Sequence, residues 1–233
     1  MINNSRVVAV LAALNEDRNI AQVVDQIVSL GYNCIVVDDG STDQTAQLAR
    51  VSGADVVSHS MNLGQGFSMI TGFHAIQREA FDFVICMDGD GQHDPVHIPA
   101  FIDKLNETNA DMVVGSRRLG TNYSTAPFFR KTFLPLFTLL INAITGYRLT
   151  DAMSGFRAFR MESLSRMIPI FDSLIEPQYY VSEMYIRFSR SGLRIEEVPI
   201  DMQPRGHGQS YKGFVRYGMG VLKAIIRAIL SHS

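Results

Sequence analysis

The chain has 233 residues, of which 46% are hydrophobic and 19% charged, and its formal net charge is −2 at pH 7. This length and apolar content allow a sizeable buried core, so we expect a single domain. The cations are scattered among apolar runs and form no contiguous basic cluster, so we expect no nucleic-acid partner.

The charge is distributed unevenly along the chain. Residues 1–116 contain five Lys or Arg and fifteen Asp or Glu, whereas residues 117–233 contain sixteen and eight. An acidic first part and a basic second part indicate two different kinds of ligand.

The two cysteines, Cys34 and Cys86, both fall inside apolar runs, which indicates buried thiols in a reducing compartment and not a disulfide framework. No N-terminal targeting signal is visible. The longest apolar stretch, 133–144, contains a Pro and an Asn and is too short to cross a bilayer. We therefore expect a cytoplasmic protein, soluble or peripheral at the cytoplasmic face of a membrane.

The first half of the chain alternates strand and helix patterns. Continuous apolar runs predict strands that are buried on both faces, and apolar residues at helical spacing predict the helices between them. The predicted strands are 7–14, 34–39, 54–59, 82–88 and 111–116; the predicted helices are 20–28, 45–51, 69–76 and 98–105. Repeated units of this kind predict an α/β fold with an open, mostly parallel sheet flanked by helices. Ligands of such sheets bind beyond the carboxyl ends of the strands.

The second half is less regular. The predicted helices are 128–144, 179–190 and 214–230, the predicted strands are 155–160 and 194–200, and 203–213 is predicted to be a mobile loop. In the terminal helix, three cations share one narrow stripe and the apolar residues lie opposite. The cations are Arg216, Lys223 and Arg227, and the opposite side holds Gly218, Val221, Leu222, Ile225 and Ile229. This pattern suits a helix packed on the body, or an interfacial helix on anionic lipid, which we favour.

Polar residues gather where four of the predicted strands end, at 15–17, 38–43, 88–94 and 115–118. Each cluster alone is explained by turns or helix caps; Asp43 and Asp94, the latter followed by Pro95, are typical cap residues. Four clusters at the same edge of one sheet indicate a binding site.

Asp88 and Asp90 follow a buried strand and are separated by a single glycine. Two such carboxylates repel each other unless one is protonated or a cation lies between them. Oxygen ligands suit Mg²⁺ or Mn²⁺, which keep open positions for waters and substrate phosphates, better than they suit zinc. Gln92 and His93 are further candidate contacts.

Seven motifs, in this order, resemble those of family 2 glycosyltransferases with the GT-A fold, and in particular the polyprenyl- or dolichyl-phosphate sugar synthases. They are LNEDRNI, VVDDGSTDQT, NLGQGFSMITGF, MDGDGQHDP, VGSRR, DAMSGFRAFR and RGHGQS. The resemblance implies one GT-A catalytic domain over 1–233. Its parts would be a nucleotide-sugar and metal-binding half (1–116), an acceptor half with a mobile loop (117–211) and a C-terminal amphipathic helix (212–233).

The resemblance also implies roles on the donor side. Glu16 and Asp39 would bind the base and ribose of a nucleotide sugar, and Arg205 would belong to a loop that closes on the diphosphate. Asp88 and Asp90, together with Gln92, would hold the Mg²⁺ or Mn²⁺ ion. The chain departs from the family pattern in two places: Ala12 stands where a Pro is frequent, and Tyr211 stands where a Lys usually follows Ser210.

On the acceptor side, the resemblance implies that Arg117 and Arg130 bind a phosphate and that Asp151 is the general base. A hydroxyl acceptor needs such a base. A phosphate monoester, with a second pKa near ~6, is mostly dianionic at neutral pH, so Asp151 would then act more in positioning. Glu183 is expected to pair with Arg187 one helical turn away.

These observations predict an inverting, metal-dependent glycosyltransferase that moves a sugar from a nucleoside-diphosphate sugar to a polyprenyl phosphate, at a membrane surface. The alternative acceptor is a glycan hydroxyl on a cell-surface polysaccharide or glycolipid. A nucleotidyltransferase fits less well because it would need a glycine-rich loop after the first strand, and residues 11–20, which cover the end of that strand and the loop, contain no glycine. A non-catalytic module is disfavoured because Asp88, Asp90, Asp151 and Arg205 are all retained.

Overall fold

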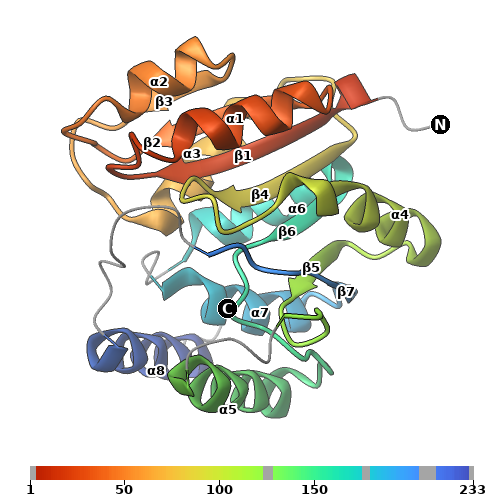
Figure 1. Cartoon of the computed structure of the whole chain (residues 1–233). Coiled ribbons are helices and arrows are strands. Elements are labelled where there is room, and N and C mark those ends of the chain that lie inside the picture. Colours follow the sequence, from red (N-terminus) through yellow and green to blue (C-terminus); the bar gives the residue numbers. More distant parts are fainter. Residues whose placement is uncertain (1–3, 123–127, 175–178, 205–213, 231–233) are drawn as a thin grey trace.

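A seven-stranded mixed sheet forms the centre of the protein (Figure 1). The computed structural model describes residues 4–122, 128–174, 179–204 and 214–230. The strands are β1 (Val7–Ala13), β2 (Asn33–Asp38), β3 (Asp55–Ser58), β4 (Phe83–Asp88), β5 (Met112–Ser116), β6 (Arg157–Arg160) and β7 (Ile195–Pro199). They lie in the order β3-β2-β1-β4-β6-β5-β7. The predicted α/β fold with a mostly parallel sheet is therefore confirmed.

The central strands β1, β2 and β4 are mainly apolar because helices cover both of their faces; the exceptions are Asn33 at the start of β2, and Asp38 and Asp88 at the ends of β2 and β4. β1 pairs in parallel with β2 and with β4, and its register aligns Ala13 with Asp38 and Ala12 with Asp88. The carboxyl ends of these three strands therefore meet at one edge of the sheet, which is where the polar clusters were predicted to gather.

The order of the strands on the other side of β4 was not predicted. β6 lies between β4 and β5 and is antiparallel to both, with Arg157 opposite Cys86 on one side and Val114 on the other. Since β6 runs in the opposite direction, the segment that precedes it lies at the edge where β4 and β5 end. Residues 150–156 are thereby brought to the candidate site.

Helices cover the two faces of the sheet. They are α1 (Ile20–Ser29), α2 (Thr45–Val51), α3 (Gln65–Ile76), α4 (Ile98–Thr108), α5 (Phe128–Thr145), α6 (Met161–Asp172), α7 (Tyr180–Arg190) and α8 (Phe214–Leu230), with short 3₁₀ turns at Asn4–Arg6 and Pro95–His97. Residues of α1, α2 and α4 fill one core layer, and residues of α3 and α5 to α8 fill the other.

α3 begins at Gln65, four residues before the first of the apolar positions that mark it in the sequence, so its first turn reaches the site. α6 was not predicted, although its buried residues Leu164, Met167, Ile168 and Phe171 recur at helical spacing. Phe171 contacts the ring of Phe73 on α3, with 4.9 Å between the centroids.

The terminal helix α8 packs against α7 and lies beside α5, at the bottom of Figure 1. Its apolar side chains divide into two sets. Val221, Ala224, Ile225 and Ala228 are buried against the body, whereas Met219, Leu222, Ile226, Ile229 and Leu230 are exposed. The predicted packing on the body is thus present, together with a second apolar stripe that faces outward beside Lys223 and Arg227. None of the helices in the described ranges is long and apolar enough to cross a membrane.

Candidate active site

The loops after β1 and β2 are bonded to each other at the carboxyl edge of the sheet. The backbone N–H of Asn15 donates to Ser41 Oγ at 2.9 Å, and Thr42 N–H donates to Asn15 Oδ1 at 2.9 Å. Glu16 N–H donates to Thr45 Oγ1 at 2.8 Å. Because these bonds join residues far apart in sequence, the first two polar clusters form one rigid support for the residues that they carry.

The two carboxylates predicted for the donor nucleotide lie in this support and are nearly buried. Glu16 is 7% exposed and accepts a hydrogen bond from Asn19 Nδ2 at 2.6 Å. Asp39 is 4% exposed and accepts from the backbone N–H groups of Leu63 (2.9 Å) and Gly64 (2.8 Å), and one of its oxygens lies 2.8 Å from His59 Nδ1. Asp39 therefore anchors the loop that leads into α3.

Asp88 ends β4 and receives contacts from two other segments. Gln65 Nε2, at the start of α3, donates to Asp88 Oδ1 at 2.6 Å. Gly155, just before β6, faces the other oxygen, and a Cβ atom at that position would lie 3.2 Å from Asp88 Oδ2. The sequence analysis did not single out Gln65 or Gly155; their motifs were noted, but only the fold brings them to Asp88.

Asp90 and its neighbours form the turn after β4. Asp90 Oδ1 accepts from the backbone N–H of Gln92 at 3.0 Å, which closes the turn. His93 is buried, stacks on the ring of Phe156 with 5.0 Å between the centroids, and accepts the backbone N–H of Asp88 on Nδ1 at 3.2 Å. Burial lowers the pKa of His93 to about 4, so the ring is neutral at neutral pH. In this structure His93 supports the backbone of Asp88. Asp94 caps the 3₁₀ turn by accepting from Val96 N–H at 3.0 Å, as predicted.

The oxygen ligands at the end of β4 suit a divalent ion that is coordinated partly by the protein and partly by a substrate. Asp88 and Asp90 are both half-buried and offer carboxylate oxygens. Across the described ranges, no group of three or more His, Cys, Asp or Glu side chains is arranged to hold a metal ion. Two carboxylates with open positions suit Mg²⁺ or Mn²⁺, which usually take further ligands from water and phosphate.

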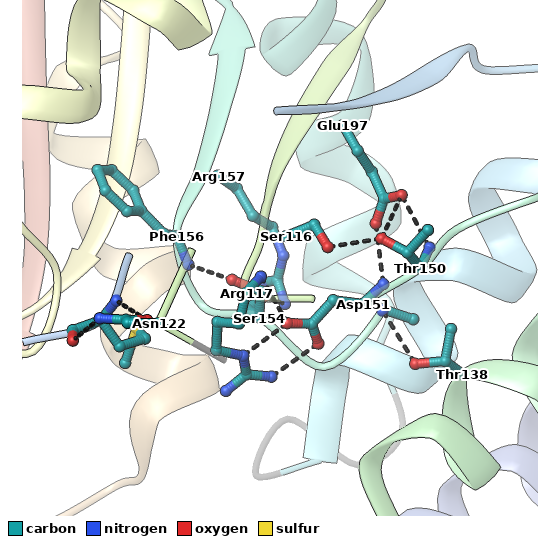
Figure 2. A network of polar contacts seen from close by, with 12 residues as sticks. Ser116, Arg117, Asn122, Thr138, Thr150, Asp151, Ser154, Phe156, Arg157 and Glu197 are labelled. Carbon is teal, nitrogen blue, oxygen red and sulfur yellow. Dashed lines mark hydrogen bonds and ion pairs between the residues drawn. The ribbon is translucent and has the colours of Figure 1, made fainter. Parts of the chain in front are cut away.

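On the side predicted to bind the acceptor, Arg117 and Asp151 form a two-pronged ion pair (Figure 2). Arg117 Nε donates to Asp151 Oδ2 at 2.6 Å and one terminal nitrogen donates to Oδ1 at 2.7 Å. The backbone N–H of Arg117 also donates to Oδ2, at 3.1 Å. Asp151 is 2% exposed. The structure thus brings together the predicted phosphate-binding residue and the predicted general base, and both oxygens of that base accept from the arginine.

Side chains that the sequence analysis did not identify surround this pair. Glu197 on β7 accepts from the backbone N–H groups of Thr150 (2.8 Å) and Asp151 (2.9 Å). Thr138 Oγ1 on α5 accepts from Ala152 N–H at 3.2 Å. Arg157 is fully buried and donates to the carbonyl oxygen of Ser154 and to the hydroxyl of Tyr180, the latter at 3.0 Å. Together they hold the segment before β6 at several points.

Of three further predictions, one is confirmed by the structure and two lie outside the described part of the chain. Arg205 falls in 205–213, outside the described residues. Arg130 lies in the first turn of α5, but its side chain is outside the described part. Glu183 is buried and accepts from Arg187 Nε at 2.8 Å, so the predicted pairing within α7 is confirmed.

Comparisons with known proteins agree with this geometry. The family model described as Glycosyl transferase family 2 matches residues 8–168. The undecaprenyl-phosphate mannosyltransferase of Micrococcus luteus is 33% identical over 183 residues, which cover 76% of this chain and 74% of that protein. The UDP-N-acetylglucosamine–dolichyl-phosphate N-acetylglucosaminyltransferase of Methanococcus voltae is 29% identical over 211 residues, which cover 82% of this chain and 83% of that protein.

Solved structures resemble the whole chain. Glucosyl-3-phosphoglycerate synthase from Mycobacterium tuberculosis, in complex with Mn²⁺, UDP and phosphoglyceric acid, has a TM-score of 0.74 and 24% identity, and the match covers 99% of this chain and 80% of that chain. The same synthase in complex with Mn²⁺, UDP-glucose and phosphoglyceric acid has a TM-score of 0.69 and 26% identity, with 98% and 79% covered. The likeness confirms the GT-A type of fold predicted from the sequence.

Proposed function

Because the chain belongs to glycosyl transferase family 2 and is a glycosyltransferase, we propose that it moves a sugar from a nucleoside-diphosphate sugar to a polyprenyl phosphate, with inversion at the anomeric carbon. Two relatives named for transfer to undecaprenyl or dolichyl phosphate support this acceptor class. The observation that carries the proposal is the buried pairing of Arg117 with Asp151.

The pairing favours a phosphate acceptor over a hydroxyl. A hydroxyl must lose its proton during transfer, and a general base for that proton needs a carboxylate oxygen directed at the acceptor. Both oxygens of Asp151 accept from Arg117 instead. A phosphate monoester, mostly dianionic above a pKa of about 6, needs no such base. Asp151 then orients the Arg117 fork, whose outer N–H groups suit phosphate oxygens.

On the donor side, we propose that Asp88 and Asp90, with Gln92, hold a Mg²⁺ or Mn²⁺ ion. When bound, such an ion neutralises the diphosphate and stabilises it as the leaving group. Glu16 and Asp39 are proposed to bind the base and ribose, and Arg205 to contact the diphosphate. The Mn²⁺ and UDP-glucose bound in the solved synthase support this class of ligand.

We also propose that the exposed faces of α5 and α8 contact a lipid bilayer. Leu136 and Leu139 on α5 are 59% and 65% exposed, and they continue the helix that begins beside Arg130. The exposed residues of α8 extend this apolar area, because α8 lies beside α5; a Cβ atom added at Gly218 of α8 would lie 3.5 Å from the Phe137 ring of α5. Lys131, Lys223 and Arg227 add exposed positive charge. An apolar surface rimmed by cations suits an anionic bilayer, in which the prenyl chain of the acceptor resides.

An acceptor panel tests the proposal. The purified chain is supplied with Mn²⁺ and UDP-, GDP- or dTDP-sugars, and each donor is paired with a short-chain prenyl phosphate, the matching prenyl alcohol or a glycan. We expect transfer to the prenyl phosphate and none to the alcohol. Transfer to the glycan hydroxyl, with none to any prenyl phosphate, would show that the alternative acceptor is correct.

A further inference from the structure

Glu197 lies in the middle of β7, where a carboxylate is unusual for a strand. Its two oxygens accept three hydrogen bonds from two consecutive residues. Oε2 accepts from the backbone N–H of Thr150 at 2.8 Å and from its hydroxyl at 2.9 Å, and Oε1 accepts from the backbone N–H of Asp151 at 2.9 Å. From β7, the Glu197 side chain thus holds the backbone of Thr150 and Asp151, which precede β6. These three hydrogen bonds are called the grip below.

A second bond connects this grip to the strand that carries Arg117. Ser116 ends β5, is fully buried, and its hydroxyl lies 2.5 Å from the hydroxyl of Thr150. Since the Thr150 hydroxyl donates to Glu197, it accepts from Ser116. Glu197 lies opposite Val114 on the adjacent strand β5, and Arg117 directly follows that strand. The segment before β6, which contains Thr150 and Asp151, is thus bonded both to β7 through Glu197 and to the end of β5 through Ser116 (Figure 2).

Glu197, Asp151 and Arg117 form a chain of contacts in which each charged residue holds the next. Glu197 fixes the backbone of Asp151, and Asp151 in turn holds the guanidinium of Arg117 with two side-chain bonds of 2.6 and 2.7 Å. A two-pronged bond is sensitive to the angle of the carboxylate, because both N–H groups must align at once. Rotation of the Asp151 backbone would therefore misalign the arginine fork.

We propose that Glu197 is a positioning residue, which sets the direction of the Arg117 guanidinium through Thr150 and Asp151 and so tunes binding of the acceptor phosphate. This inference rests on the proposed function, in which Arg117 contacts that phosphate. In this proposal Glu197 contacts neither the donor nor the acceptor, since its oxygens accept from Thr150 and Asp151.

The test variant is Glu197→Gln. A glutamine keeps one acceptor oxygen, but its NH₂ group then faces a backbone N–H or the Thr150 hydroxyl, so at least one bond of the grip is lost. The matched control is Glu196→Gln, because Glu196 is the adjacent residue of β7, is also half-buried and points to the opposite face of the sheet. The assay contains Mn²⁺, a UDP-sugar and a short-chain prenyl phosphate. We expect Glu197→Gln to raise the KM for the prenyl phosphate roughly 10-fold to 100-fold, by analogy with metal sites, where loss of a residue that orients a ligand weakens binding by this factor. The KM for the donor and the kcat at saturating acceptor should stay within about twofold.

A purely structural role would give a different result. The same substitution is made in an Arg117→Lys background, where the fork is already absent. If Glu197 acts through Arg117, the second substitution adds little to the acceptor KM; if the effects of the two substitutions multiply, the proposal is wrong.

An NMR measurement checks the positioning without any turnover. The Nε–H signal of Arg117, assigned by its loss in Arg117→Lys, should shift or broaden in Glu197→Gln and remain unchanged in Glu196→Gln. If Glu197→Gln leaves both this signal and the acceptor KM at their wild-type values, the proposal is refuted. If the wild-type chain transfers no sugar to prenyl phosphate while the signal still moves, the proposed acceptor is wrong but the link from Glu197 to Arg117 holds. If Glu197→Gln does not fold, Thr150→Val, which removes only the hydroxyl bonds, must show the same changes at smaller size.

Discussion

Asp88 is surrounded more closely than its place at the end of a strand requires. Gln65 donates to one carboxylate oxygen, the ring of His93 accepts its backbone N–H, and Gly155 leaves room beside the other oxygen. These contacts come from three different segments of the chain. They restrict the carboxylate to one orientation, and a preorganised ligand loses less freedom when a cation binds.

The space beside Asp88 leads to a first prediction. In Gly155→Ala, the new Cβ would lie 3.2 Å from Asp88 Oδ2 and 3.4 Å from His93 Cε1, so the carboxylate must move by a few tenths of an ångström. We expect the affinity for Mn²⁺, measured by isothermal titration calorimetry, to fall about tenfold. Asp90→Asn, which removes a ligand charge, should abolish both Mn²⁺ binding and transfer.

The control for this prediction is Gly218→Ala, whose Cβ would meet Phe137 at an ordinary contact distance of 3.5 Å. It should bind Mn²⁺ like the wild type. Undiminished Mn²⁺ affinity in Gly155→Ala would mean that Asp88 is not a ligand in its present orientation.

At the scale of elements, α6 joins the two halves of the chain through aromatic packing. Phe171 is 1% exposed, and its ring centroid lies 4.9 Å from that of Phe73 on α3 and 5.6 Å from that of Phe188 on α7. α3 also carries Gln65, which contacts Asp88. The position of the first turn of α3 therefore depends in part on this cluster.

Phe171→Ala should lower the free energy of unfolding by about 3–5 kcal/mol, because it removes a buried ring and leaves a cavity. Urea denaturation measures the change. Val51→Ala, at a position that is 79% exposed on α2, should change stability by less than about 0.5 kcal/mol. A loss below about 1 kcal/mol for Phe171→Ala would show that the cluster repacks.

The exposed apolar stripes of α5 and α8 are the elements proposed to contact lipid. Leu136→Ser combined with Leu139→Ser should weaken binding to vesicles of phosphatidylcholine and phosphatidylglycerol by roughly tenfold or more, since burial of each leucine is worth about 1.5–3 kcal/mol when complete. Co-sedimentation with the vesicles measures this binding.

Val51→Ser provides the matched control for vesicle binding, because it removes an exposed apolar side chain on the other face of the sheet. It should bind vesicles like the wild type. If the double leucine variant binds vesicles as tightly as the wild type, α5 does not contact the lipid.

Over the whole molecule, the acidic and basic parts of the sequence meet at one edge of a single sheet. The loops after β1, β2 and β4 present Glu16, Asp39, Asp88 and Asp90, and the loops after β5 and before β6 present Arg117 and Asp151. Gly155, four residues after Asp151, faces Asp88. The proposed donor and acceptor sites are therefore adjacent but are built from different side chains.

This separation predicts that acceptor binding can be weakened without any effect on the donor. Arg117→Lys keeps a positive charge beside Asp151 but loses the planar fork. We expect the KM for prenyl phosphate to rise about 10-fold to 100-fold, since a charge-assisted bond is worth about 1.5–3 kcal/mol. The thermal shift caused by a UDP-sugar with Mn²⁺ should remain at its wild-type size.

Arg118→Ala is the control, because Arg118 is the next residue and is exposed. It should leave the KM for prenyl phosphate unchanged. An equal effect of both substitutions would point to general electrostatic attraction and not to a specific fork.

The sequence alone determined the class of fold and the position of the acidic site. Apolar runs and helical spacing identified every strand of the sheet and all its α-helices except α6, because these patterns are local. The end of a predicted strand located Asp88 and Asp90. The following Pro95 indicated that Asp94 is a cap residue, and the hydrogen bond from Val96 N–H to Asp94 confirms it. Only the tertiary structure decided which distant residues meet. Glu197 is 46 residues from Asp151, and Gln65 is 23 residues from Asp88. The Glu197–Asp151 contact depends on the insertion of β6 between β4 and β5 and on the pairing of β7 with β5, whereas the Gln65–Asp88 contact depends on how α3 packs beside the end of β4. These long-range choices leave no periodic trace in the sequence.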